Sequence, residues 1–228
     1  MRVRAPHPWD LDPRDAVAVQ RELSRRVVTQ NQTGQVRTVA GVDVSTARNR
    51  ARAAVVVLSF PSLEPVEASQ ADLPLTFPYI PGLLSFREGP AILAALESLQ
   101  VEPDLLIFDG QGMAHPRRMG LATHLGIVVD RPSIGCAKSR LCGEHDEVGP
   151  QVGDYAELLH QGELIGAVLR TRQGVKPVYI SVGHRVDLRA AISYVLQCGA
   201  GYRLPEPIRW AHRIAGGAQL PPASTKGS

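Results

Sequence analysis

Apolar positions in the first third of the chain follow two different periods. Over residues 13–27 they recur every three or four positions, which predicts a helix, and the Asp-Pro pair at position 12 is typical of a helix start. Three later segments are instead rich in β-branched and apolar side chains, which predicts strands at residues 36–45, 52–60 and 66–73. Because the connections between these strands are short, we expect an antiparallel meander.

Helices and strands alternate through the rest of the chain. Prolines and glycines punctuate residues 76–90, which predicts a loop, and Pro90 can open the helix that follows. The later expected elements are a helix to residue 99, a buried strand at 104–110, a helix at 119–129, strands at 132–138, 163–171 and 176–183, a helix at 188–198 and a short helix at 203–215.

This order of elements predicts one α/β domain over residues 1–215. A meander followed by helix–strand units suggests the ribonuclease-H-like fold, a mixed sheet with helices on both faces. Residues 216–228 have the composition of a disordered tail.

Composition is that of an ordinary water-soluble domain and narrows the environment. Of the 228 residues, 44% are hydrophobic and 21% are charged. No apolar run is long enough to span a membrane, and the N-terminus has no apolar signal segment. Three cysteines without metal-type spacing favour a reduced chain, so we expect a cytoplasmic protein.

Two aspartates stand where apolar strands end. Asp43 follows GV in GVDVS, and Asp109 closes DLLIFDG. One such aspartate is more often a turn or helix cap. Two of them on strands that can lie side by side favour a Mg²⁺ site, because this cation is held by a few carboxylates together with water and phosphate oxygens. Glu88 could be a third carboxylate there, or simply an acidic residue in the first turn of a helix.

Basic residues gather after the second of these strands. DGQGMAHPRRMG combines Gly112, His115, Arg117 and Arg118 in one loop, where glycine allows close approach of a phosphate and a helix start attracts an anion. An Arg-Arg pair is usually a solvated helix face, but its place beside an acidic strand end favours phosphate contact. Lys138 also follows a strand and could stabilise charge on a reacting phosphate. The net charge of +3 adds little to this argument.

The segment PYIPG holds Tyr79 and Ile80 between prolines and ends at Gly82. A stiff loop that presents an aromatic and an aliphatic side chain is suited to insertion between nucleic-acid bases. The alternative is that Tyr79 fills the core, and the sequence leaves both interpretations open.

Taken together, the motifs PYIPGLLSFRE, DGQGMAHPRRMG, PSIGCAKSRLCG and GYRLPEPIRWAH resemble the endonuclease V family. The resemblance extends from about residue 42 to residue 212. It implies a Mg²⁺- or Mn²⁺-dependent repair enzyme that recognises deoxyinosine in DNA and cuts the second phosphodiester bond 3′ to it, leaving 3′-hydroxyl and 5′-phosphate ends. One departure is Gln111, where many members have histidine, so proton transfer at this position is in question.

The resemblance also assigns residues. It implies metal binding by Asp43, Asp109 and Glu88, and catalytic roles for the same three residues and for His115, Lys138 and His212. It implies contacts with the DNA or the lesion by Tyr79, Ile80, Pro81, Gly82, Leu84, Gly112, Arg117 and Arg118.

Other functions remain open at the level of sequence. The same chemistry could act on inosine-containing RNA, because contacts to a 2′-hydroxyl cannot be seen in a sequence. A non-catalytic nucleic-acid-binding module would be expected to have lost one of the three carboxylates, and a small-molecule hydrolase would not need the PYIPG loop. We expect a monomer, although neither the oligomeric state nor the number of metal ions follows from the sequence.

Overall fold

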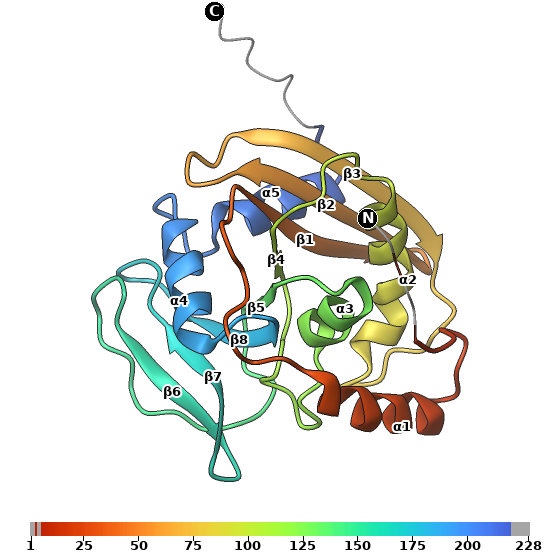
Figure 1. The fold of residues 1–228 in the computed structure, drawn as a ribbon, viewed down its shortest axis with the longest axis horizontal. Helices are drawn as coiled ribbons and strands as arrows, with labels where there is room; N and C mark the ends of the chain where they lie inside the picture. The colour runs from red at the N-terminus through yellow and green to blue at the C-terminus, as the bar shows by residue number, and fades with distance from the viewer. Residues whose placement is uncertain (1–2, 4–5, 220–228) are drawn as a thin grey trace, which may run out of the picture.

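The computed structural model describes residues 3 and 6–219. They form an eight-stranded sheet in the order β3-β2-β1-β4-β5-β8-β7-β6, with helices packed against it (Figure 1). The strands are β1 (Thr38–Ala47), β2 (Arg50–Ser59), β3 (Pro65–Pro74), β4 (Leu105–Phe108), β5 (Ser133–Ala137), β6 (Tyr155–His160), β7 (Glu163–Leu169) and β8 (Val178–His184). The helices are α1 (Pro13–Leu23), the short 3₁₀ helix η1 (Ser24–Arg26), α2 (Leu84–Glu97), α3 (Leu121–Val129), α4 (Leu188–Gln197) and α5 (Glu206–Ala215).

Strand directions confirm the predicted ribonuclease-H-like fold. β1, β2 and β3 pair antiparallel, as expected for the meander. β4 and β5 then continue the sheet parallel to β1. β8, β7 and β6 extend the other side with antiparallel pairing. The last of these strands, β6, was not expected from the sequence, because this edge strand exposes Tyr155, Glu157 and Leu159 and fully buries only Leu158.

Helices cover both faces of the sheet, and the core is divided accordingly. Val39 and Ala40 are neighbours on β1, so their side chains lie on opposite faces. Ala40 belongs to a cluster with the buried residues of α2 and α3, whereas Val39 belongs to a cluster with those of α4 and α5. Among the described residues, no helix has the length and apolar character needed to cross a bilayer.

The helix predicted to open at Pro90 begins earlier, at Leu84, with Pro90 inside it. Proline inside a helix costs about 3 kcal/mol. The packing of the preceding turn offsets this cost, because Phe86 is buried between Phe77 and Trp9 and Gly89 lies directly under Trp9. This correction moves Glu88 from a loop into the second turn of α2.

Three other predictions concern the two ends of the chain. Asp12 caps α1 as expected, since its carboxylate accepts from the backbone N–H groups of Arg14 and Asp15. The α-helix ends at Leu23 rather than near residue 27. Of the predicted disordered tail, residues 220–228 lie outside the described residues.

Candidate active site

Asp43 and Asp109 lie side by side because their strands are parallel neighbours. Val42 of β1 is in register with Phe108 of β4, so the next residue on each strand extends from the same edge. The backbone N–H of Asp109 also donates to the Val42 carbonyl at 2.9 Å. The two side chains are only 11% and 10% exposed. Two carboxylates in such a position repel each other, which favours either protonation or a bound cation.

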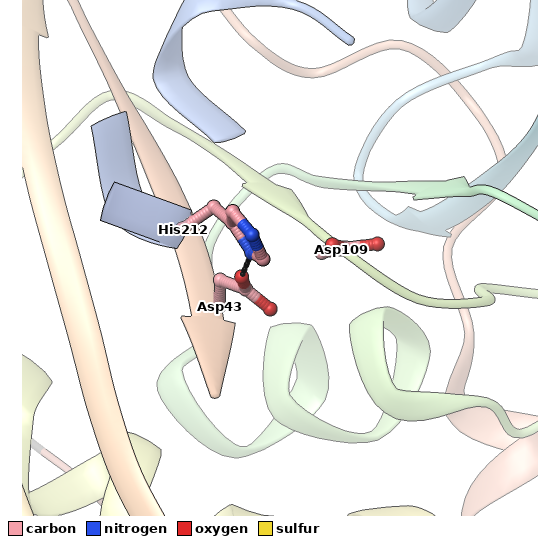
Figure 2. A group of neighbouring side chains, drawn as sticks. All are labelled: Asp43, Asp109 and His212. Atoms are coloured by element: carbon pink, nitrogen blue, oxygen red, sulfur yellow. Dashed lines mark hydrogen bonds and ion pairs between the residues drawn. The ribbon is translucent and has the colours of Figure 1, made fainter. Parts of the chain in front are cut away.

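Helix α5 brings an imidazole to the same place. The Nδ1 atom of His212 lies 2.7 Å from Asp43 Oδ2, and Figure 2 shows this ring against Asp43, with Asp109 nearby on the next strand. Gly41 makes this approach possible, because a Cβ atom there would lie 1.9 Å from the Pro207 carbonyl oxygen at the start of α5. The helix therefore rests directly on the backbone of β1.

The three groups fit a divalent cation. One ligand atom each from Asp43, Asp109 and His212 all lie within 4.8 Å of one another. Carboxylate oxygens and an imidazole nitrogen are both common ligands of divalent cations. Burial, followed by the charge of Asp43, raises the pKa of the Asp109 carboxyl, so a positive charge at this point would be stabilising.

Glu88 faces the same centre from α2 but is not one of that group of three. Burial raises its pKa to about 8, the charges of Asp43 and Asp109 add to the shift, and Arg87 opposes it. The Lys138 ammonium is hydrogen bonded to Asp109, and the lysine side chain is 40% exposed. Three acidic residues and one lysine predicted from the sequence thus meet beside the ends of β4 and β5. Asp43 was expected at the end of its strand, but β1 continues to Ala47, so Asp43 lies inside β1.

A cavity of about 350 Å³ adjoins this acidic centre. Asp109 and Lys138 belong to its lining, so the cavity is continuous with the centre. Five residues predicted to contact a lesion also line it, namely Tyr79, Ile80, Pro81, Gly82 and Leu84. Tyr79 is 70% exposed, which agrees with a protruding side chain rather than a core position.

His115 and Arg117 are directed at the backbone of this cavity wall rather than at the acidic centre. The Arg117 backbone N–H donates to His115 Nδ1 at 3.1 Å, so the ring proton is on Nε2, which donates to the Gly82 carbonyl at 3.0 Å. Burial lowers the pKa of His115 to about 4, with Arg117 adding to the shift. The Arg117 guanidinium donates to the same carbonyl at 2.8 Å. Both side chains therefore hold the backbone of the cavity wall at Gly82 in place.

Two further residues predicted to bind nucleic acid also have partners within the protein. Arg118 pairs with Glu163 at 2.7 Å and donates to the His115 carbonyl at 2.9 Å. The Gly112 N–H donates to the Ser181 hydroxyl at 2.8 Å, and a Cβ atom at Gly112 would lie 2.2 Å from the Val182 carbonyl oxygen. Neither residue lines the cavity.

Gln111 is held in one orientation beside the cavity. Its Nε2 donates to the Ser139 carbonyl at 2.8 Å, whereas Oε1 is buried without a hydrogen-bond partner in the described part of the chain. An amide does not titrate near neutral pH, so this side chain supplies hydrogen bonds rather than proton transfer.

Comparison with known proteins identifies the family. The Endonuclease V family model matches residues 21–213. The chain belongs to the endonuclease V family. It is 54% identical over 218 residues to the endonuclease V of Trichormus variabilis, a match that covers 94% of this chain and 99% of the relative. As an endonuclease V family member, the protein is a nuclease.

Solved structures of the endonuclease V family share its fold. The Streptomyces avermitilis enzyme superimposes with a TM-score of 0.88 at 42% identity, covering 95% of this chain and 96% of that chain. The Ciona intestinalis enzyme superimposes with a TM-score of 0.78 at 26% identity, covering 89% and 95%. The Ciona structure holds a 23-mer DNA that contains an inosine followed by a ribo-adenosine.

Gln20, which lines the cavity, was not predicted from the sequence. Gln20 of α1 is buried and hydrogen bonded to the Gly82 carbonyl. Its position in the sequence could have indicated a role. Ala16, Gln20 and Leu23 form the buried stripe of α1, and a polar side chain in such a stripe needs a hydrogen-bond partner.

Proposed function

We propose that this enzyme recognises deoxyinosine in DNA and hydrolyses the second phosphodiester bond 3′ to it, with Mg²⁺ as the cofactor and Mn²⁺ as a substitute. The observation that carries the proposal is the continuity between the acidic centre and the cavity through Asp109 and Lys138. A volume of about 350 Å³ is at the lower end for small-molecule sites and suits one base turned out of the helix.

The loop that ends at Gly82 is suited to hold the duplex open. Tyr79 is exposed, and Pro78 and Pro81 restrict the backbone around it, so little conformational entropy is lost when the loop enters a base stack. Tyr79 would fill the gap that the displaced base leaves, while the base rests beside Gly82 and Leu84. A relative from Ciona intestinalis was crystallised with inosine-containing DNA, which supports this substrate class.

The side chains of the acidic centre divide the chemistry among them. Asp43, Asp109 and His212 would hold the cation, with Glu88 beside them. A divalent cation at this point supplies positive charge that activates water and stabilises the reacting phosphate. Glu88 orients the attacking water, whose oxygen bonds to phosphorus as the bond from phosphorus to the 3′ oxygen breaks. Lys138 stabilises the negative charge that develops on the phosphate. The products carry a 3′-hydroxyl and a 5′-phosphate.

For His115 we propose a role in supporting the cavity wall in place of the catalytic role that the resemblance implies. Both ring nitrogens are hydrogen bonded to backbone groups, and burial lowers the pKa of the ring to about 4, which favours the neutral form.

Inosine-containing RNA is a second candidate substrate. The observation in its favour is the ribo-adenosine that follows the inosine in the DNA bound to the Ciona intestinalis relative, since a 2′-hydroxyl is accepted there. For this chain we propose DNA as the main substrate, and action in the cytoplasm as a monomer.

A nicking assay tests the proposal directly. Duplex DNA with one deoxyinosine and RNA with one inosine are incubated with the enzyme in Mg²⁺ or in EDTA, and product ends are mapped. We expect cleavage of the DNA in Mg²⁺ only, and a fall of roughly a thousandfold or more in Asp43→Ala and Asp109→Ala, because each removes a ligand of the activating cation. Asp104→Ala, on a carboxylate bonded to the other end of β1, is the control. Near-normal rates in either site variant at saturating Mg²⁺ would show that the metal assignment is wrong.

A further inference from the structure

A single amide on the first helix joins two segments of the cavity wall. The Nε2 group of Gln20 donates to the Gly82 carbonyl at 2.9 Å and to the Met119 carbonyl at 3.0 Å. Its Oε1 accepts from Arg117 Nε at 2.6 Å. Gln20 is 1% exposed, so these bonds are made out of contact with water. Its two donors therefore bond to backbone of the cavity wall, and its oxygen accepts from a side chain that bonds to the same Gly82 carbonyl.

The two segments that Gln20 joins come from distant parts of the sequence. Gly82 ends the PYIPG loop, and Met119 leads into α3. Gly82, Met119 and Gln20 itself all line the cavity. Because the amide bonds to both carbonyls at once, it fixes the separation between the loop and the start of α3.

The Gly82 carbonyl is the point on which this network converges. It accepts from Gln20, His115 and Arg117, at 2.9, 3.0 and 2.8 Å. Gly82 has a φ of +81°, and a Cβ atom there would lie 2.8 Å from the Arg117 guanidinium, so the donors close tightly around the backbone. A buried acceptor or guanidinium that loses its partner is costly, which makes this arrangement rigid.

We propose that Gln20 is a positioning residue for base recognition, which sets the width of the cavity through its bonds to Gly82 and Met119. The inference rests on the proposed function and extends it to a residue just outside the stretch that the family model matches. Glutamine suits this role because it offers two donors and an acceptor in one planar group. Gln20 touches neither the acidic centre nor the reacting bond, so it acts on binding and selectivity through the backbone.

Two variants of Gln20 remove different sets of its hydrogen bonds. Gln20→Met keeps the length of the side chain and removes every bond. Gln20→Glu keeps an acceptor for Arg117 and removes both donors to the carbonyls. Leu23→Ala is the matched control, because it weakens the packing of the same helix at a buried position that does not line the cavity. All variants are compared with the wild type at temperatures equally far below their melting points.

The kinetic readout is KM against kcat on deoxyinosine DNA. We expect both Gln20 variants to raise KM about tenfold and leave kcat within about threefold, because the groups on β1, β4 and α5 are undisturbed. Binding to DNA with an abasic site at the same position should be unchanged, since no base enters the cavity. Equal kinetics for Gln20→Met and Leu23→Ala, or full rescue by Gln20→Glu, would overturn the proposal.

Hydrogen–deuterium exchange gives a readout that does not need catalysis. We expect faster exchange of the backbone around Gly82 and Met119 in both Gln20 variants than in Leu23→Ala. This result stands even if the wild type does not cut deoxyinosine DNA, so failure of the proposed function and failure of the Gln20 inference are distinguishable. Unchanged exchange in Gln20→Met would refute the role of Gln20 as a link between the walls.

Discussion

Tyr79 is a residue whose accessibility separates a role in the core from a role in binding. It is 70% exposed, so removing its ring should change the free energy of unfolding by less than about 1 kcal/mol. Stacking on a base contributes roughly 1–3 kcal/mol, so Tyr79→Ala should weaken binding to deoxyinosine duplex by about that amount. The defect should shrink on single-stranded DNA, where less stacking is broken.

Melting temperatures and binding isotherms measure both quantities. Tyr155→Ala is a suitable control, because this tyrosine of β6 is also exposed, at 56%, and does not line the cavity. A melting temperature lowered by about ten degrees or more in Tyr79→Ala, with DNA affinity unchanged, would show that the ring stabilises the fold and does not contribute to binding.

The acidic centre could be predicted from sequence because it follows a general rule of sheets. Asp109 directly follows β4. Asp43 lies inside β1 rather than at its end as predicted, but it directly follows the last residue of β1 that pairs with β4, so the parallel pairing still brings the two aspartates together. The directions of His115 and Arg117 could not be predicted in the same way. They depend on the Gly82 carbonyl, which lies more than thirty residues earlier in the chain (33 residues from His115, 35 from Arg117). Local spacing carries no information about such a partner.

At the scale of elements, the position of His212 depends on how closely α5 lies on β1. Gly41→Ala would place a Cβ atom 1.9 Å from the Pro207 carbonyl oxygen. This oxygen belongs to the backbone of α5, so no side-chain rotation can relieve the clash. We expect the helix to shift, the free energy of unfolding to fall by about 1–3 kcal/mol, and nicking to fall at least tenfold in protein that is still folded.

A control separates lost packing from a lost active site. Gly166→Ala would place a Cβ atom 2.4 Å from the Ile180 carbonyl oxygen, between β7 and β8. This variant should lose comparable stability and retain nicking per folded molecule, as measured by thermal melts and rates at the same temperature. Equal loss of activity in the two variants would mean that the close contact between α5 and β1 has no specific effect on the active site.

Two elements show where the pattern of apolar residues misleads. Pro90 suggested a helix start, yet α2 begins six residues earlier because Phe86 and Gly89 pack against aromatic side chains from distant segments. β6 carries exposed apolar residues at the edge of the sheet, so its sequence lacks a regular buried face. In both cases tertiary contacts outweigh the local signal.

At the scale of the whole molecule, buried neutral histidines link stability to pH. Burial lowers the pKa of His115 to about 4 and that of His124 to about 3. In the unfolded chain both titrate near 6.5, so the unfolded state binds more protons at intermediate pH. Their contribution to stability is therefore complete above pH 6.5 and is lost as the pH falls towards 4.

Denaturation by urea at pH 7 and pH 5, in EDTA, checks this sign. Each histidine should account for a loss of about 1–2 kcal/mol between the two values. Glu88 acts in the opposite direction, because its raised pKa of about 8 makes the folded state bind more protons. The comparison is therefore made between the wild type and His115→Asn or His124→Asn, which should each reduce the acid-induced loss. If neither variant alters the difference between pH 7 and pH 5, the histidines are not buried in the neutral form.

The contact between Asp43 and His212 has a consequence for the synthesis of the enzyme on the ribosome. These residues are 169 positions apart, and ribosomes add about 5–20 residues per second. The imidazole is therefore synthesised roughly 10–30 s after the carboxylate that it joins. During that interval the growing chain is surrounded by ribosomal and messenger RNA and lacks one part of its cutting centre. Of the three residues that can hold a cation, His212 is synthesised last, so this site can be completed only after translation has passed residue 212.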